Sequence, residues 1–432
     1  MKFKEIIKLF RDQGCNRILV KNLAANDNSK NQIYLGGEDA LYLLPSVETK
    51  LEKQYSKKKK ADEFIFHNKL DFSWLDENGV HAAPSARLIF YPQYPESRLS
   101  GFLRGCKNSP SNLLAGRHEN RVLFLSSGNG KKSFGLVTCR DKGLDEKIEK
   151  YSVPFGKGEV FFYIGPDLER KDSVSEIKHA IRGICTLGWI ESCKLGKDGN
   201  LHPYKAQNGG GYTLEGHLGV KPNGDAEPDY KGWELKQHAA KSNIITLLTP
   251  EPDAGFYNEK GVAEFIKKYG YPDKKERGNR LNFGGIYKHG AESHKDTKLC
   301  LKLIGFENGD IKDENGYIGL FNTKGIVVAK WTFPKLLEHW SRKHAKACYV
   351  QSEKDTIKGI IHYRFLSEIS LGIGTKFFNF LKGVEEQIIY LDPALKLEYD
   401  DNGKPTTKAR SQFRIHKKNL ELLYKSFENH TV

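Results

Sequence analysis

Short stretches of alternating apolar and polar residues dominate the first 165 positions of the chain. Strand-like stretches bounded by turn-forming residues lie at positions 16–20, 32–35, 86–91, 121–126, 134–139 and 159–164. A repeat of two residues places one side of a strand in a core and the other in solvent. The pattern therefore predicts a strand-rich barrel or sandwich, preceded by an amphipathic helix at the N-terminus.

A polar, turn-prone segment at 165–173 interrupts this pattern. Beyond it, apolar residues recur at helical spacing, at Val174, Ile177, Ile181 and Ile184. The change of period predicts a domain boundary, with a first domain at 1–168 and a second at 174–432.

The second part of the chain mixes both periods. Helices are predicted at 213–219, 260–269, 334–344 and 375–384, and strands at 232–236, 243–249, 326–331 and 346–350. Interleaved helices and strands predict an α/β or α+β core. Near the end, positions 395–398 and 412–416 flank a turn at 400–403, which predicts a hairpin-like ending.

The chain has 432 residues, with 69 Lys and Arg against 54 Asp and Glu, and a formal net charge of +15. A hydrophobic share of 38% suffices for packed cores, which excludes disorder as the main state. Both parts carry the basic excess, so two surfaces for a polyanion are expected, with simple solubility as the competing explanation. The lysine run at 57–60 is interpreted as a solvated loop, with weak phosphate contact as the alternative.

Cysteines and histidines are scattered. The seven cysteines form no C-x-x-C pair, which favours reduced structural thiols over disulfides or a zinc ribbon. No Cys/His cluster has zinc spacing, so no zinc is expected. There is no run of 18 apolar residues and no signal-peptide core, which predicts a cytoplasmic protein.

Candidate chemistry lies in a strand-like stretch that begins with a turn. Glu234 and Lys236 would share one face of that strand, because side chains alternate, and Asp229 in the turn before it can approach the same place. Two carboxylates and the Leu235 carbonyl are hard oxygen donors suited to Mg²⁺. A neighbouring lysine can orient and help deprotonate a water, as phosphodiester hydrolysis requires.

Glu-x-Lys is a common pattern in a chain rich in both residues. The stretch at 166–171 contains similar residue types but lies in the expected linker. Glu176 and Lys178 lie on a helical pattern, which points their side chains to different sides. From the pattern alone, a nuclease site and an ordinary salt-bridged strand remain equally open.

Several motifs in a fixed order favour the nuclease site over the salt-bridged strand. They are Gly188-Trp189, the segments 213–218, 228–236, 238–242 and 246–249, Trp331-Thr332-Phe333, and Gln412-Phe413-Arg414-Ile415. With these motifs the chain from about residue 180 onward resembles the MvaI/BcnI group of restriction endonucleases, within the PD-(D/E)xK superfamily. The resemblance implies a C-terminal α/β restriction-endonuclease-like core that binds and cleaves double-stranded DNA.

The resemblance also implies roles for individual residues. Asp229, Glu234 and the Leu235 carbonyl would bind Mg²⁺, and Lys236 would be the catalytic lysine. Glu215 would support the metal site. Arg414 would read a guanine edge, where a bidentate guanidinium fits O6 and N7. Further DNA contacts would come from His238, Lys241, Lys408 and Arg410.

The first part of the chain is similar to EcoRII-like effector domains. The matching segments are 21–27 with Asn31 and Gln32, 86–91, and 95–100. The resemblance implies an all-β pseudobarrel, related to plant transcription-factor DNA-binding domains, that grips DNA with two arms. Lys21, Asn26, Asp27 and Gln32 would belong to the first arm, and Glu96 and Arg98 to the second. The alternatives are a polar turn for the first set and a surface ion pair for the second.

Together the two halves resemble UbaLAI-like Type IIE restriction endonucleases. The resemblance implies a monomer that cuts at CCWGG, where W is A or T, and whose effector domain binds a second copy of the site. A modification-dependent or strand-nicking nuclease and a non-catalytic DNA-binding protein are the alternatives. The intact set of Asp229, Glu234 and Lys236 argues against the last.

Overall fold

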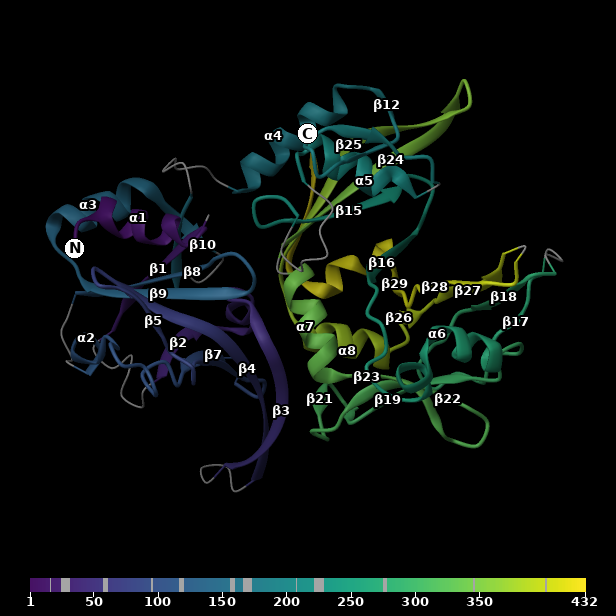
Figure 1. Ribbon diagram of the computed structural model, residues 1–432, viewed down its shortest axis with the longest axis horizontal. Helices are drawn as coiled ribbons and strands as arrows, with labels where there is room; N and C mark the ends of the chain where they lie inside the picture. The colour runs from purple at the N-terminus through teal and green to yellow at the C-terminus, as the bar shows by residue number, and fades with distance from the viewer. Residues whose placement is uncertain are drawn as a thin grey trace. The chain divides into compact units, whose positions relative to one another are not determined.

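The computed structural model describes residues 1–15, 17–24, 32–56, 61–94, 96–115, 120–155, 160–165, 173–206, 208–220, 229–274, 278–344, 346–400 and 402–432. The chain divides into two compact units, Met1–Lys178 and His179–Val432, coloured purple to blue and teal to yellow in Figure 1. Among the described residues, no helix is long and apolar enough to cross a membrane.

The N-terminal unit is built on one large sheet. Eleven strands join in the order β10-β11-β1-β8-β9-β4-β6-β7-β2, with β3 and β5 also paired to β4. Its elements are α1 (Phe3–Asp12), β1 (Ile18–Leu23), β2 (Gln32–Gly36), η1 (Glu38–Tyr42), β3 (Ser46–Ser56), β4 (Ala61–Asp76), β5 (Gly79–Ala82), β6 (Arg87–Tyr91), β7 (Glu96–Ser100), α2 (Ser111–Ala115), β8 (Arg121–Ser127), β9 (Lys132–Cys139), α3 (Lys142–Tyr151), β10 (Ser152–Phe155) and β11 (Phe161–Ile164). The six strands expected from the alternating pattern are confirmed as β1, β2, β6, β8, β9 and β11.

Two helices complete the core of this unit. α1 buries Phe3, Ile6, Ile7 and Phe10 against the sheet residues Val122, Phe124 and Leu136. α3 adds Leu144 and Ile148, and it begins where the Asp141 side chain accepts a hydrogen bond from the Leu144 N–H. The unit is therefore sheet-rich with packed helices rather than purely β.

The C-terminal unit is a mixture of small sheets and helices. Its elements are α4 (Ser173–Cys185), β12 (Trp189–Glu191), β13 (Cys193–Leu195), β14 (Leu201–Pro203), α5 (Gly209–His217), β15 (Glu234–Ala239), β16 (Ile244–Leu248), α6 (Phe256–Tyr269), β17 (Tyr271–Pro272), β18 (Arg280–Gly284), β19 (Cys300–Ile304), β20 (Phe306–Glu307), β21 (Asp310–Ile311), β22 (Tyr317–Phe321), β23 (Val327–Thr332), α7 (Phe333–His344), β24 (Lys346–Ile357), β25 (Ile360–Thr375), α8 (Phe377–Glu385), β26 (Ile389–Leu391), β27 (Ala394–Tyr399), β28 (Pro405–Lys408), β29 (Phe413–His416), η2 (Lys417–Leu423) and β30 (Tyr424–Thr431). α4 crosses the division between the units.

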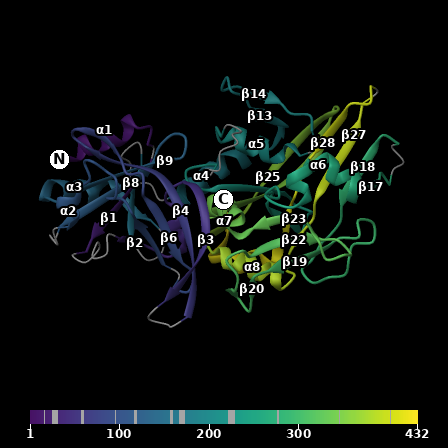
Figure 2. The same ribbon diagram turned by 60° about the horizontal axis from the view of Figure 1, so that its bottom comes forward.

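Three sheets of this unit carry candidate site residues. The first has the order β12-β25-β24-β15, with β30 on β25, and β15 runs parallel to β24. The second is β16-β29-β26 and the third is β17-β18-β27-β28, with α6 packed beside the third (Figure 2). The predicted mixture of helices and strands is confirmed, since α5 to α8 and β15, β16, β23 and β24 lie at or near the expected positions.

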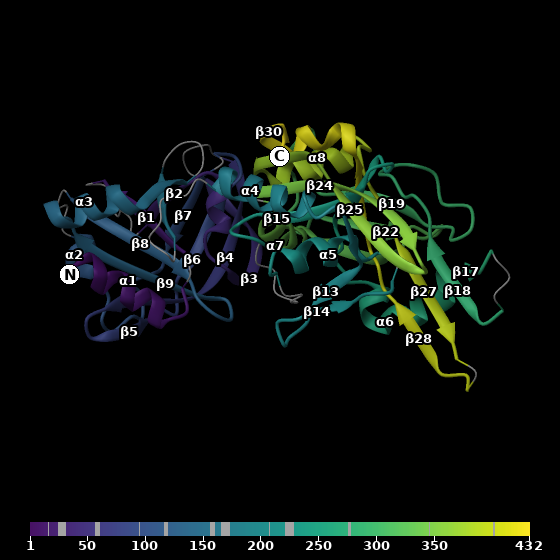
Figure 3. The ribbon, with the colours of Figure 1, turned by 90° about the horizontal axis from the view of Figure 1, so that it is seen from above.

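The predicted hairpin at the end of the chain is present, but its second strand is β28 and not the stretch at 412–416. Positions 395–398 pair with β28, whereas the stretch at 412–416 forms β29 and pairs with β26 and β16. β28 is exposed at every position and has no apolar face, so the alternating pattern gave no sign of it. Figure 3 shows β27 and β28 as a pair that extends from the body of the unit.

Candidate active site and nucleic-acid interface

Asp229 is placed by a tight turn in front of β15. Tyr230 and Trp233 exchange two backbone hydrogen bonds, of 3.0 and 2.8 Å, around Lys231 and Gly232. Both central residues have positive φ, 46° and 86°, as in the two-residue turns that suit β-hairpins. The turn brings Asp229 back to β15, where its Oδ2 accepts a 2.8 Å hydrogen bond from the Leu235 N–H.

Strand geometry places the Leu235 carbonyl next to Asp229. β15 ends its sheet order, so only one of its edges is paired to β24. The Leu235 N–H points to the other edge, because it donates to Asp229. The N–H and C=O of one residue in a strand point to the same side. The Asp229 carboxylate and the Leu235 carbonyl therefore lie at one open strand edge.

Glu234 and Lys236 form a close ion pair on one face of β15. The Lys236 Nζ donates to Glu234 Oε1 at 2.7 Å, and the two side chains are 16% and 3% exposed. A carboxylate this deeply buried requires a charged partner, because desolvation otherwise disfavours its ionised form. The opposite face is anchored by Trp233, which is fully buried under the Lys346 ammonium.

A buried tyrosine pair lies near this ion pair, and the sequence had not indicated it. The Tyr349 and Tyr424 hydroxyls are 2.7 Å apart, on β24 and β30. Burial raises the pKa of both, and the negative charge of Glu234 raises each further. Tyr349 stands opposite Lys236 in the parallel pair, so the tyrosines belong to the surroundings of the site. No short sequence pattern indicates the pair, because the two tyrosines meet only through the pairing of β24 and of β30 with β25.

Glu215 lies on α5, which packs closely on β15. A side chain in place of Gly210 would come within 2.7 Å of Gln237, so glycine at this helix start permits the close approach. Gln237 faces away from Glu234 and Lys236, since side chains alternate along β15. Glu215 is half-buried on this helix, and its support of the metal site stays a prediction.

The two further candidates on and after β15 differ in exposure. His238 is 7% exposed, and burial lowers the pKa of its imidazole, which favours the neutral form. Lys241 is exposed in the turn between β15 and β16. Lys241 can therefore reach a ligand as it stands, whereas His238 offers little surface.

The oxygen donors fit a small, hard divalent cation. Within the part of the chain that the structure describes, no three His, Cys, Asp or Glu side chains gather into a metal-binding cluster. Mg²⁺ needs fewer protein ligands, because it commonly uses one or two carboxylates and retains several waters. Asp229, Glu234 and the Leu235 carbonyl match that donor set and lack the nitrogen and sulfur that zinc prefers.

Arg414 lies on β29 and is held by two side chains. Its Nη1 is 2.8 Å from Asp392 Oδ2, and its Nη2 donates to Gln412 Oε1 at 2.7 Å. Burial raises the pKa of the Asp392 carboxyl, although the Arg414 guanidinium acts in the opposite direction. Gln412 was expected only as part of a motif, and Asp392 had no signal in the sequence because it lies 22 positions from Arg414.

The N-terminal candidates fall into two groups. Arg98 donates to Glu96 Oε1 at 2.8 Å and to Gln32 Oε1 at 3.1 Å, and lies 5.7 Å from the Tyr91 ring centroid. β7 pairs with both β2 and β6, so Glu96 and Arg98 lie on a strand and not in a loop. Lys21 lies buried in β1 and donates to the Asn22 carbonyl at 3.1 Å. Asn26 and Asp27 lie outside the described residues.

The remaining sequence features can be placed as well. Glu176 and Lys178 lie on the helix α4 and not on a strand, and positions 166–171 and 57–60 are outside the described residues. All seven cysteines are free thiols. Lys408 is exposed on β28, and Arg410 is half-buried just beyond it.

Comparisons with known proteins identify a family, and similar solved structures include two of a restriction endonuclease. A model of the MvaI/BcnI restriction endonuclease family matches residues 178–424. The solved structures are titled as restriction endonuclease MvaI in complex with its cognate DNA substrate and in the absence of DNA. Each is 19% identical to this chain, and each match covers 60% of this chain. The matches cover 99% of the DNA-bound chain and 98% of the DNA-free chain, with TM-scores of 0.47 and 0.32. No curated protein matches the chain.

Proposed function

Because the chain belongs to the MvaI/BcnI restriction endonuclease family, we propose that it is a Mg²⁺-dependent Type II endonuclease that hydrolyses phosphodiesters of double-stranded DNA at a specific sequence. The observation that carries the proposal is the arrangement at β15. The buried Glu234 carboxylate is paired to Lys236 at 2.7 Å, and Asp229 is fixed at the adjacent strand edge by the Leu235 N–H.

Each residue of this site has a separate task. Asp229, Glu234 and the Leu235 carbonyl would hold the Mg²⁺. When bound, the ion neutralises the charge that develops on the phosphate. Lys236 orients the attacking water and helps to remove its proton, and the Glu234 carboxylate holds the lysine in place. Glu215 would support the carboxylates from α5.

We propose CCWGG as the recognition sequence, with Arg414 as a reader of guanine. Asp392 and Gln412 fix the plane of its guanidinium, which suits bidentate recognition of O6 and N7. His238, Lys241, Lys408 and Arg410 would add DNA contacts. The excess of basic residues in the chain supports a polyanionic partner.

We further propose a Type IIE arrangement in a monomer, in which the N-terminal unit binds a second copy of the site as an effector domain. Gln32, Glu96 and Arg98 support this role, because their hydrogen bonds hold an arginine in a fixed orientation on two paired strands. Lys21, Asn26 and Asp27 would complete the surface, although Lys21 must leave its buried position to do so.

Digestion of plasmid DNA tests the proposal. Unmethylated plasmid is incubated with the full chain in Mg²⁺ or in chelator, and the product ends are sequenced. Discrete double-strand ends at one sequence, only in Mg²⁺, are expected. Open circles alone would favour a strand-nicking enzyme. Cleavage of methylated plasmid only would favour a modification-dependent enzyme. Binding without cleavage would favour a non-catalytic DNA-binding protein.

A further inference from the structure

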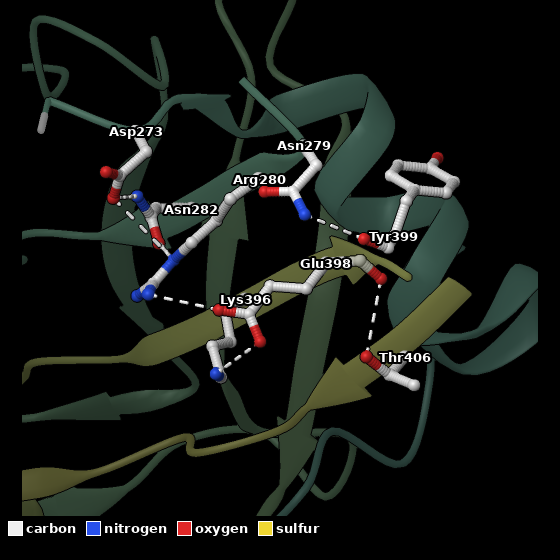
Figure 4. Close-up of polar contacts among 8 residues, drawn as sticks. All are labelled: Asp273, Asn279, Arg280, Asn282, Lys396, Glu398, Tyr399 and Thr406. Carbon is white, nitrogen blue, oxygen red and sulfur yellow. Dashed lines mark hydrogen bonds and ion pairs between the residues drawn. The ribbon is translucent and has the colours of Figure 1, made fainter. Parts of the chain in front are cut away.

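The Glu234–Lys236 ion pair of β15 can be compared with a pair of the same residue types and spacing on β27. There, the Lys396 Nζ lies 2.6 Å from Glu398 Oε2, and the two side chains are 30% and 32% exposed. Glu398 also lies 3.1 Å from Arg280 of β18, as Figure 4 shows. Glu234 is far more deeply buried, at 3% exposed. A carboxylate that has lost its water needs polar groups of the protein in place of that water.

Small residues beside Glu234 leave space on the face of β15 that carries the ion pair. Glu234 pairs with Ala347 of β24, and Ala347 pairs with Gly372 of β25. One row along, Lys236 pairs with Tyr349. Paired residues of neighbouring strands point to the same face of a sheet, so these three partners lie on the face of the ion pair. Alanine and glycine fill little of that face, which leaves room for a larger side chain from outside the row.

Tyr424 of β30 occupies this space. A Cβ atom at Gly372 would come within 2.7 Å of the Tyr424 ring, so the ring lies directly on the glycine. Its hydroxyl is 2.7 Å from that of Tyr349, which stands in the neighbouring row. Phe427 packs on both rings, with centroid distances of 6.1 Å to Tyr349 and 5.9 Å to Tyr424. The two hydroxyls are therefore buried and held by aromatic packing on the face of the ion pair.

The charge of Glu234 acts on both hydroxyls. Burial is the largest cause that raises the pKa of Tyr349 and of Tyr424, and the negative charge of Glu234 raises each pKa further. Both phenols are therefore neutral and keep their hydrogens. Within the pair one hydroxyl donates to the other, so the second O–H is directed to an acceptor outside the pair. Hydroxyl dipoles orient in the field of a nearby charge, and a carboxylate attracts their hydrogen ends.

We propose that Tyr349 and Tyr424 are positioning residues for DNA cleavage, whose paired hydroxyls solvate the buried Glu234 carboxylate and keep it in place as a ligand of the divalent cation. The inference rests on the proposed function and deepens it. Lys236 neutralises the carboxylate by its charge, whereas the hydroxyls supply dipoles that packing already holds in position. Preorganised dipoles of this kind are worth more in a water-excluded site than in solvent.

The proposal predicts a defect in the use of the cation rather than in the fold. Tyr349→Phe and Tyr424→Phe keep the aromatic rings and remove only the hydroxyls. The Glu234 carboxylate is then less well solvated and less firmly placed, so more Mg²⁺ is needed to fill the site. Because hydrogen bonds to charged groups are stronger than neutral ones, each variant should raise the half-saturating Mg²⁺ concentration roughly five- to tenfold.

Single-turnover cleavage over a Mg²⁺ series is the first test, with the full chain and a duplex that carries the cleaved sequence. Tyr399→Phe on β27 is the matched control, because it also removes one phenol hydroxyl from this unit. The hydrogen bond from Asn279 to Tyr399 in Figure 4 is accepted by the backbone carbonyl and so persists. The control should keep the Mg²⁺ requirement of the wild type within about twofold. An unchanged requirement in folded Tyr349→Phe and Tyr424→Phe would overturn the inference.

Urea unfolding in chelator tests the same contact without cleavage. Tyr424→Phe is introduced into the wild type and into Glu234→Gln with Lys236→Met, which carries no charge at these two positions. The midpoint should fall by about 0.5 to 1 M in the wild type and by less than about half as much in the uncharged background, where no carboxylate remains to be solvated. Tyr349→Phe repeats the comparison if Tyr424→Phe does not fold.

The two tests separate this inference from the proposed function. Equal losses of midpoint in the charged and uncharged backgrounds would overturn the role of the hydroxyls at Glu234. Absence of Mg²⁺-dependent cleavage by the wild type would instead contradict the proposed function. The midpoints would then still decide whether the tyrosine hydroxyls solvate the Glu234 carboxylate.

Discussion

The candidate active site and the surroundings of Arg414, the proposed guanine reader of the same unit, are assembled in opposite ways. Asp229, Glu234 and Lys236 are brought together by one turn and one strand, within a few positions of each other. Arg414 meets Asp392 only because two separate chain segments pair, through β29 and β26. A site formed by residues that are close in sequence can be recognised from a sequence pattern. A surface formed by distant segments cannot be recognised until the strand register is known.

Because the active-site residues lie so close together in sequence, we expect catalysis to depend on single residues of β15. Lys236→Ala should reduce DNA cleavage to background, because the water loses its orienting ammonium, while binding to the specific duplex in Ca²⁺ stays measurable. Lys178→Ala on α4 is the matched control and should cut normally. Cleavage by Lys236→Ala at a rate near that of the wild type would remove the lysine from the mechanism.

The same ion pair should also contribute to stability in a characteristic way. Lys236→Met leaves the buried Glu234 carboxylate without its partner and should lower the free energy of unfolding by about 3 to 5 kcal/mol. Adding Glu234→Gln should restore much of the loss, because no unpaired charge then remains buried. Denaturant unfolding of the two variants measures this, and an equal loss in both would mean that the pair is not coupled.

At Arg414, a smaller and selective effect is expected. Arg414→Ala should weaken binding to the cognate duplex by roughly 1 to 3 kcal/mol more than binding to a scrambled duplex. Asp392→Asn keeps the arginine but removes its ion pair, so an intermediate loss of discrimination is expected. Competition binding with the two duplexes gives both values. An equal loss on both duplexes would assign Arg414 to a phosphate.

The smallest expected effect concerns the N-terminal unit. If this unit binds its own copy of the site, linking two copies on one plasmid raises the effective concentration and accelerates cleavage. Arg98→Ala should remove that several-fold stimulation while one-site cleavage persists. Rates on one-site and two-site plasmids are compared for the variant and for Lys107→Ala, an exposed control in the same unit. Undiminished stimulation in Arg98→Ala would exclude Arg98 from effector binding.

The sequence predicted the local elements of the fold well. The Glu234–Lys236 face and the helices α5 to α8 follow from periodicity, because their signals lie within one element. β28 was missed because all of its residues are exposed, and α5 begins earlier than expected because its glycines permit contact with Gln237. The Asp392–Arg414 pair and the two buried tyrosines depend on sheet register, which no short pattern encodes.

We expect Asp229 to contribute to cleavage and not to affinity. The most direct test of this role compares Asp229→Asn with the wild type on one cognate duplex, measuring binding in Ca²⁺ and single-turnover cleavage in Mg²⁺. We predict binding within about threefold of the wild type, since affinity comes mainly from phosphate contacts elsewhere, and cleavage at background. Cleavage by Asp229→Asn at the wild-type rate, with unchanged dependence on Mg²⁺, would contradict the account.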